Sequence, residues 1–281
     1  MSYMFLNYRM CGEDHGNLLD LSNWDTSNVR NFQGMFSGFN GYKLLGGGCY
    51  GVNVKFPEAT GTEAGGLKTG AQANISYMFE NSKIYTNLNP IVPEEGETLL
   101  FKYESPTIKL SDIIQTKDVA NFSHLFDGAY SGEIEGKPEE GTPYWYESVT
   151  IDVSDIDYSN ATDMSYMFAN AFTKSIFGGD GATNQLTGRL NLFKNAGKEI
   201  EQTINGEHFF DGCNVKEIDL TNFNTGLFNN LSYFFANYGY RECLGVIKSL
   251  NLFDMSNAKA VAGLFYNSYF TTEDGEPLVL D

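Results

Sequence analysis

The heptapeptide Met164-Ser165-Tyr166-Met167-Phe168-Ala169-Asn170 is written, with variations, eight times in this chain. The fifth residue of each copy is a phenylalanine, which we call the anchor: Phe5, Phe36, Phe79, Phe126, Phe168, Phe210, Phe235 and Phe265. An Asn or a Gly stands two residues after every anchor. Recurrence of this kind predicts a protein built from stacked repeats.

An alternating apolar-x-apolar triplet precedes most anchors. Such alternation predicts a short strand with one buried face. The triplets are Leu19/Leu21, Val52/Val54, Ile108/Leu110, Ile151/Val153, Leu190/Leu192, Ile218/Leu220, Leu250/Leu252 and Leu278/Leu280.

The anchor segment itself predicts a short helix. The Asn or Gly after the anchor suits a left-handed residue that ends a helix. A helix of one or two turns is unstable alone, so neighbouring units must stabilise it by packing. An Asn or Asp five residues before the anchor suits a helix N-cap, at Asn31, Asn74, Asn121, Asp163, Asn205 and Asn230.

Each unit is therefore expected to run strand, turn, short helix and return. One unit cannot bury its own apolar face, whereas a stack of units buries a continuous core. The sequence thus predicts an α/β repeat protein, a leucine-rich-repeat-like solenoid of short parallel strands and short helices, with residues 1–281 as one segment. Long irregular inserts interrupt it at residues 55–73, 80–107 and 127–150.

Composition limits the partners. The formal net charge of −18 would repel nucleic-acid backbones and anionic lipid. No apolar run approaches the roughly 18 residues of a membrane span, so no membrane insertion is expected within this segment. No CxxC pair is present, so we expect buried free thiols at Cys11, Cys49, Cys213 and Cys243.

The stretch from Leu19 to Phe36, LDLSNWDTSNVRNFQGMF, resembles the repeat of BspA-like bacterial surface proteins. That family's unit, roughly 25 residues long, reads "LDLSxFDTSNVTNMSxMFxxC". Further matches begin at Asp163 and Ile218, and Cys213 falls where that consensus often has Cys. The resemblance implies a leucine-rich-repeat-like solenoid, a location on the cell surface or outside the cell, and an adhesion or recognition role.

This chain departs from the family in its long inserts. Related repeats also resemble modules of phage and mobile-element proteins, which makes a virion location the alternative. Met1-Ser2-Tyr3-Met4-Phe5 repeats the sequence of residues 164–168, and Leu278-Val279-Leu280-Asp281 matches the start of a unit. We therefore expect these residues to be a window on a longer protein, truncated at both ends.

The histidines His124 and His208 each lie two residues before an anchor. Other units have Tyr3, Tyr77, Tyr166 and Tyr233 at this position, which indicates a structural role for both histidines. No GxSxG, HExxH or Walker-type loop is present. The sequence therefore predicts no catalytic residues, no cofactor and no metal site.

Acidic residues offer two weaker alternatives. Asp155 and Asp157 could imitate a glycosidase pair, but the repeat pattern accounts for them. Calcium could bind Asp152, Asp155 and Asp157, or Glu94, Glu95 and Glu97, although no EF-hand spacing is present. A solvated acidic surface is the simpler interpretation.

The inserts carry the candidate binding residues, Tyr103, Tyr130, Tyr144, Trp145 and Tyr146. Aromatic side chains with a polar group often anchor binding sites, and they also pack loops onto a protein body. The predicted function is a non-enzymatic recognition or adhesion scaffold. It would bind a host or neighbouring-cell surface protein or glycan through the inserts or the open strand face. The alternative is a structural component of a virion or surface assembly, with other subunits as partners.

Overall fold

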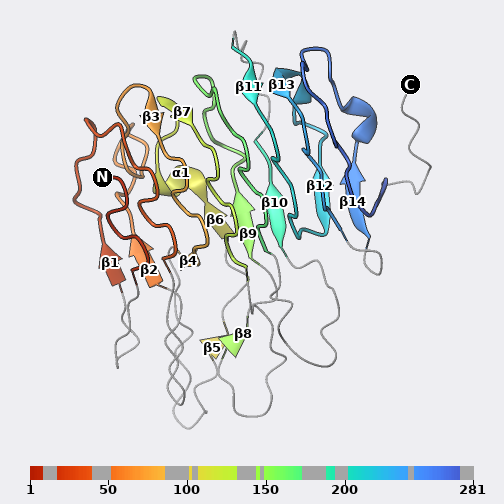
Figure 1. Ribbon diagram of the computed structural model, residues 1–281. Helices are drawn as coiled ribbons and strands as arrows, with labels where there is room; N and C mark the ends of the chain where they lie inside the picture. Colours follow the sequence, from red (N-terminus) through yellow and green to blue (C-terminus); the bar gives the residue numbers. More distant parts are fainter. Residues whose placement is uncertain are drawn as a thin grey trace.

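The computed structural model describes residues 1–8, 18–39, 52–85, 101–102, 107–131, 144–145, 149–172, 188–193, 202–239 and 244–272. Short parallel strands follow one another along the molecule, from β1 near the N-terminus to β14 near the other end (Figure 1). The result is a β-rich row of repeats in which helices are few and short.

One set of strands, which includes the strands at six of the apolar triplets, forms three sheets, ordered β1-β2-β4, β6-β9-β10 and β12-β14-β15. Every pairing in these sheets is parallel. The strands are β1 (Leu18–Asp20), β2 (Val52–Lys55), β4 (Ile84–Tyr85), β6 (Thr107–Lys109), β9 (Thr150–Asp152), β10 (Arg189–Asn191), β12 (Glu217–Asp219), β14 (Gly245–Lys248) and β15 (Phe270–Thr272).

A second set of strands lies just before the anchors. It comprises β3 (Ala73–Asn74), β7 (Val119–Asn121), β11 (Ile204–Asn205) and β13 (Phe228–Asn230). Single bridges extend this set to a parallel ladder through seven units, at Asn31, Asn74, Asn121, Asp163, Asn205, Asn230 and Ala260. The remaining pair joins β5 (Phe101–Lys102) to β8 (Tyr144–Trp145).

Six of the predicted strands are confirmed, and one is wrong. Residues Leu250–Leu252 form a 3₁₀ helix, and β14 is the strand of that unit. The chain turns sharply between the two because Ser249 has a left-handed backbone with φ 55°. The triplet Leu278/Leu280 lies outside the described residues.

The predicted helices at the anchors are wrong. In the described part of the chain the helical segments are α1 (Leu110–Ile113) and the 3₁₀ turns Thr225–Leu227 and Leu250–Leu252, each between a strand and an anchor. The anchor segment is instead a ribbon of tight turns. In the copy around Phe168, three amides close turns to the carbonyl three residues back: Met167 to Met164, Ala169 to Tyr166 and Ala171 to Phe168.

The alternate amides of the ribbon bond the next repeat. Around Phe168 the bonds run from Met164 to Asn205, Tyr166 to Glu207, Phe168 to Phe209 and Asn170 to Asp211. The same four rows recur at every junction between anchors, with donor–acceptor distances of 2.7–3.0 Å. A helix would keep its amides for its own carbonyls, so it could not form these rows.

Two local predictions survive in this different geometry. The residue two after the anchor has a left-handed backbone in all eight copies, with φ between 52° and 65°. The Asn or Asp before the anchor does accept a backbone amide, but from the residue two positions on, as when Asp163 Oδ1 accepts from Ser165 N at 3.0 Å. That bond closes an Asx turn instead of capping a helix.

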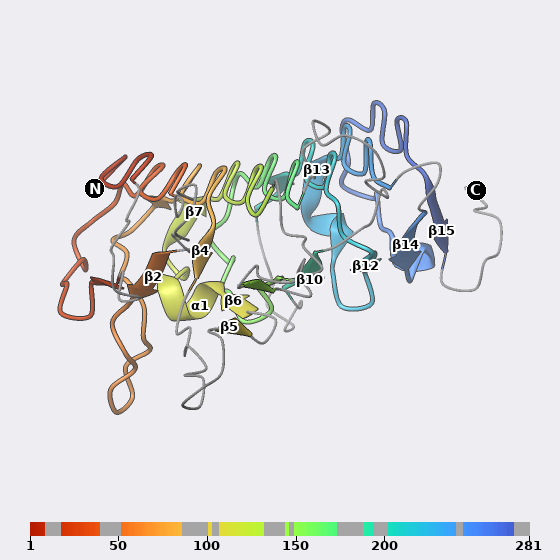
Figure 2. The same cartoon turned by 90° about the horizontal axis from the view of Figure 1, so that it is seen from below.

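The anchors form the core of the stack. Each anchor ring stacks on the next through all eight copies, with centroids 5.3–5.9 Å apart and interplanar angles of 1–14°. Figure 2 shows the anchor segments as a continuous zigzag along one edge of the molecule. The anchor edge is therefore unbroken, whereas the strands on the other side are divided into three sheets.

Candidate functional site

The position two residues before the anchor forms a row on the anchor edge, in which six residues carry rings and two are glycines. Its eight members all have left-handed backbones, with φ of 54–60°: Tyr3, Gly34, Tyr77, His124, Tyr166, His208, Tyr233 and Gly263. Such a backbone costs a non-glycine residue about 1–2 kcal/mol. The hydrogen bonds to the next repeat and the stacking of the rings offset this cost.

Both histidines are sandwiched between tyrosine rings. His124 lies 4.4 Å from Tyr77 on one side and 4.4 Å from Tyr166 on the other, centroid to centroid. His208 lies 4.4 Å from Tyr166 and 4.7 Å from Tyr233. Because each imidazole has both faces covered, only its edge is left for other groups.

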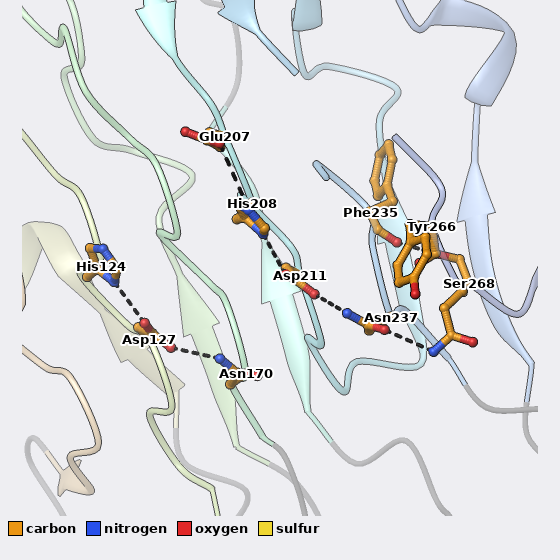
Figure 3. A network of polar contacts seen from close by, with 11 residues as sticks. His124, Asp127, Asn170, Glu207, His208, Asp211, Phe235, Asn237, Tyr266 and Ser268 are labelled. Carbon is orange, nitrogen blue, oxygen red and sulfur yellow. Dashed lines mark hydrogen bonds and ion pairs between the residues drawn. The ribbon is translucent and has the colours of Figure 1, made fainter. Parts of the chain in front are cut away.

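Each imidazole edge pairs with an aspartate of the same repeat (Figure 3). His124 Nδ1 lies 2.8 Å from Asp127 Oδ2, and His208 Nδ1 lies 2.6 Å from Asp211 Oδ2. The second oxygen of each aspartate accepts from the following repeat, from Asn170 Nδ2 at 3.1 Å and from Asn237 Nδ2 at 2.7 Å. An aspartate follows the anchor only in these two units. The pairs thus link neighbouring repeats, as the sequence-based structural interpretation of the histidines predicts.

Replacing His208 with Tyr is expected to change the free energy of unfolding by no more than about 1 kcal/mol, one hydrogen bond's worth. Tyr166 and Tyr233 occupy the same position in their own repeats and have the same left-handed backbone. The matched variant His208→Val should cost about 1–3 kcal/mol, because a β-branched residue is strained at positive φ. Urea unfolding of both variants measures the difference. Equal costs for Tyr and Val would show that neither ring stacking nor the left-handed backbone has energetic weight at this position.

A hollow opens on the strand side where the ladder splits. β10 and β12 begin side by side at the Gly188–Val215 bridge, but they belong to different sheets. The hollow has a volume of about 310 Å³ and is lined by Ser154, Leu190, Asn191, Leu192, Phe193, Asp219, Asn222 and Phe223. Its polar groups stand beside the buried rings of Phe193 and Phe223, a mixture typical of small binding sites.

The acidic side chain in the lining of this hollow, Asp219, has neighbours that favour its ionised form. Burial raises the pKa of Asp219, but hydrogen bonds from the Thr221 side chain and amide outweigh burial, and the pKa lies below its usual value. Asn191 Nδ2 donates to Asp152 Oδ2 at 3.0 Å.

The hollow was not predicted from the sequence. The one available signal was the distance from Leu190 to Phe210, 20 residues instead of the 17 between Ile151 and Phe168.

The five aromatic candidates have different positions in the structure. Tyr130, a candidate binding residue, lies in the core, since it is 2% exposed and its hydroxyl donates to the Ile84 carbonyl. Tyr144 and Trp145 form β8, paired with β5. Tyr103 and Tyr146 lie outside the described residues.

The described acidic residues considered for calcium or catalysis have structural partners. Asp152 Oδ1 accepts from Ser154 N and Asp157 Oδ1 from Ser159 N, and Asp155 forms an ion pair with Lys109 at 2.6 Å. Glu94, Glu95 and Glu97 lie outside the described residues. Within the described ranges no group of three or more His, Cys, Asp or Glu side chains is arranged to hold a metal ion.

Two further expectations concern thiols and membranes. Cys213 is a buried free thiol, as predicted, and burial raises its pKa to about 12. The other three cysteines lie outside the described residues. In the part of the chain that the structure describes, none of the helices has the length and apolar character to span a bilayer.

Comparison with known protein families matches residues 1–44 and 109–206, about half of the chain, to the family described as "Mycoplasma protein of unknown function, DUF285". Searches of curated proteins and of solved structures gave no significant match. The matched residues include the anchors Phe5, Phe36, Phe126 and Phe168 with their turn ribbons. The chain therefore belongs to the DUF285 family.

Proposed function

We propose that this chain is a non-enzymatic recognition scaffold of a larger, surface-exposed protein, and that it binds a protein or a glycan. In this proposal the repeats form a leucine-rich-repeat-like solenoid of the BspA-like kind. The resemblance of the Leu19–Phe36 unit to that family and the unbroken hydrogen-bond rows between repeats support it. Among the described residues, His124 and His208 and acidic residues such as Asp127 and Asp155 have structural partners, so contacts to a ligand fall to the parts that do not repeat.

The pairing of β5 with β8 is the observation that carries the proposal. These strands come from the two long inserts, and they pair in parallel with Phe101 opposite Tyr144 and Lys102 opposite Trp145. The pair lies beyond β6 and β9, off the strand side of the stack (Figure 1). Segments 43 residues apart in the sequence, Phe101 and Tyr144, are thus held together at one place in the fold.

The hollow between β10 and β12 supplies a second contact region on the strand side. Asn191, Asn222 and Asp219 offer amide and carboxylate groups that can bond hydroxyls or backbone amides of a ligand. Both regions are on the open strand face or next to it, whereas the anchor edge is occupied by its own stacking.

Cell binding tests this function. The probe is the fluorescently labelled 281-residue chain on cultured epithelial cells, with protease-treated and glycosidase-treated cells separating protein from glycan ligands. We expect saturable binding, weakened about tenfold or more in a Tyr144→Ala/Trp145→Ala variant. Aromatic residues buried at an interface often contribute 2 kcal/mol or more to the binding free energy. Thr62→Ala, in an exposed turn, is the control. No saturable binding, or equal binding by the double variant, would contradict the proposal.

A structural role in a virion or surface assembly is the second candidate. The observation that favours it is the uniform junction between repeats, since the same four backbone hydrogen bonds join each anchor segment to the next. Assembly and recognition are separable, because the first uses the junctions between repeats and the second uses the strand side.

A further inference from the structure

The hollow on the strand side lies where two parallel strands, β10 and β12, separate. They meet at the Gly188–Val215 bridge, and among the described residues each then pairs only with its outer neighbour, β10 with β9 and β12 with β14. Arg189 N donates to Val149 O on the β9 side, so the backbone groups of the next residue, Leu190, point toward β12. An open strand edge of this kind pairs readily with another polypeptide.

The polar side chains of the hollow offer mainly hydrogen-bond acceptors. Asp219 is a carboxylate, which only accepts when it is ionised. The Asn191 amide nitrogen donates to Asp152 Oδ2 at 3.0 Å, which leaves the Asn191 side-chain oxygen for a ligand. In the part of the chain that the structure describes, neither this oxygen nor the Asn222 side chain has a hydrogen-bond partner. The hollow therefore suits a ligand group that is rich in donors.

The charge around the hollow favours a cationic donor. Lys248 lies opposite Asp219 in the pairing of β12 with β14, and its ammonium is 3.0 Å from Glu217 Oε1, so one ammonium serves two carboxylates. Arg189, the basic residue of β10, is not among the described residues that line the hollow. The net charge of −18 adds a long-range attraction for a basic partner.

We infer that the hollow binds an arginine side chain of a protein partner, presented by an extended segment that lies along the open edge of β10. The guanidinium has five N–H donors in a planar fork and no acceptor, so it can bond the Asp219 carboxylate and the Asn191 oxygen together. Its aliphatic stem packs on the partly exposed Leu190 and Leu192. The volume of about 310 Å³ is at the small end of ligand sites, which suits one side chain.

This inference rests on the proposed recognition function, and at the hollow it selects a protein ligand over a glycan. The rings of Phe193 and Phe223 are only 1% and 4% exposed, so they offer no open face on which a sugar could stack. A neutral sugar also gains nothing from the charge of Asp219, whereas a guanidinium does.

Peptide binding tests the inference. The probe is a fluorescently labelled pentapeptide, Thr-Val-Arg-Val-Thr, and fluorescence anisotropy measures its dissociation constant from the 281-residue chain. Two further peptides replace Arg with Lys, or with citrulline, which keeps the shape of Arg without its charge. We expect the Arg peptide to bind most tightly, the Lys peptide about threefold more weakly, and the citrulline peptide about tenfold or more weakly.

Two variants change the charge of the lining in opposite directions. Asp219→Asn removes the charge but keeps the turn, because Asn224 Oδ1 accepts from Gly226 N at 3.0 Å in the same kind of turn. It should weaken binding of the Arg peptide about tenfold or more. Asn222→Asp adds a carboxylate at an exposed position and should tighten binding about threefold. Circular dichroism verifies the fold of both variants.

Asp20→Asn is the matched control. Asp20 has the repeat position of Asp219, accepts from Ser22 N at 2.9 Å and lies opposite Lys55, but it belongs to β1, away from the hollow. This variant loses the same charge and should bind the Arg peptide like the unchanged chain. Equal weakening by Asp20→Asn and Asp219→Asn would overturn the inference, because the net charge would then attract the peptide.

The remaining outcomes separate the ligands and the two proposals. Equal binding of the Arg and citrulline peptides would overturn the inference. Saturable binding of methyl α-mannoside that is lost in Asp219→Asn would also overturn it, and would assign the hollow to a glycan. Cell binding without peptide binding removes this inference alone, whereas peptide binding without cell binding supports it and contradicts the recognition of a cell surface.

Discussion

Replacing Phe168 with Ala is expected to lower the free energy of unfolding by about 3–5 kcal/mol, the range for truncating a buried aromatic residue. Phe168 is fully buried and stacks on Phe126 at 5.7 Å and on Phe210 at 5.9 Å, and it meets Phe209 edge-on at 5.5 Å. Its removal therefore breaks the row of anchors on both sides. Urea unfolding followed by circular dichroism measures the effect through the transition midpoint and slope.

The control for this prediction is the first anchor. Phe5 is only partly buried and stacks on an anchor on one side, Phe36, so Phe5→Ala should cost less, about 1–2 kcal/mol. A loss below about 1 kcal/mol for Phe168→Ala would show that the anchors do not carry the core. A larger loss of unfolding free energy for Phe5→Ala than for Phe168→Ala would show that the first anchor stabilises the stack more than a fully buried one.

Gly239→Ala is expected to cost about 2–5 kcal/mol, the sum of a left-handed backbone and an overlap in a packed region. Gly239 has φ +72° and lies where the chain leaves the seventh anchor segment. A Cβ there would overlap the carbonyl oxygen of Tyr269, which accepts the amide of Gly245 at 3.0 Å. Backbone atoms cannot turn aside as a side chain can, so β14 and the segment leading into β15 would have to move.

Gly61 separates the two causes. It has φ +60°, but a Cβ at this position meets nothing within 4 Å, so Gly61→Ala should cost only the backbone term of about 1–2 kcal/mol. Thermal and urea unfolding of the two variants give the comparison. Equal losses would mean that the close approach of Tyr269 to Gly239 has no energetic weight.

Much of the repeat can be predicted from single positions. The anchors, the left-handed Asn or Gly after them and the histidines in a tyrosine row each follow from the residue type at a fixed place. The choice between helix and turn ribbon does not, because an Asn before the segment and a left-handed residue after it suit both. The turn ribbon forms because the carbonyls of the next repeat accept hydrogen bonds from alternate amides that a helix would pair with its own carbonyls.

The candidate sites show the same limit. Tyr130 is of a residue type common in binding sites. Its ring stacks on Phe172 and its hydroxyl donates to the Ile84 carbonyl, so packing determines its role. The hollow at Asn191 and Asp219 exists because two neighbouring strands belong to different sheets. Neither feature produces a repeating pattern in the sequence, since each is formed by segments that are distant in the chain and meet only in the fold.

By itself the sequence determined a row of eight repeats, the residues of its core and the left-handed position that ends each turn ribbon. Those features depend on residue volume, polarity and backbone preference, which act locally and recur with the repeat. The tertiary structure alone decided that alternate amides bond the next repeat and that β5 meets β8. Hydrogen bonds between repeats have a direction, and that direction appears only when the repeats are stacked.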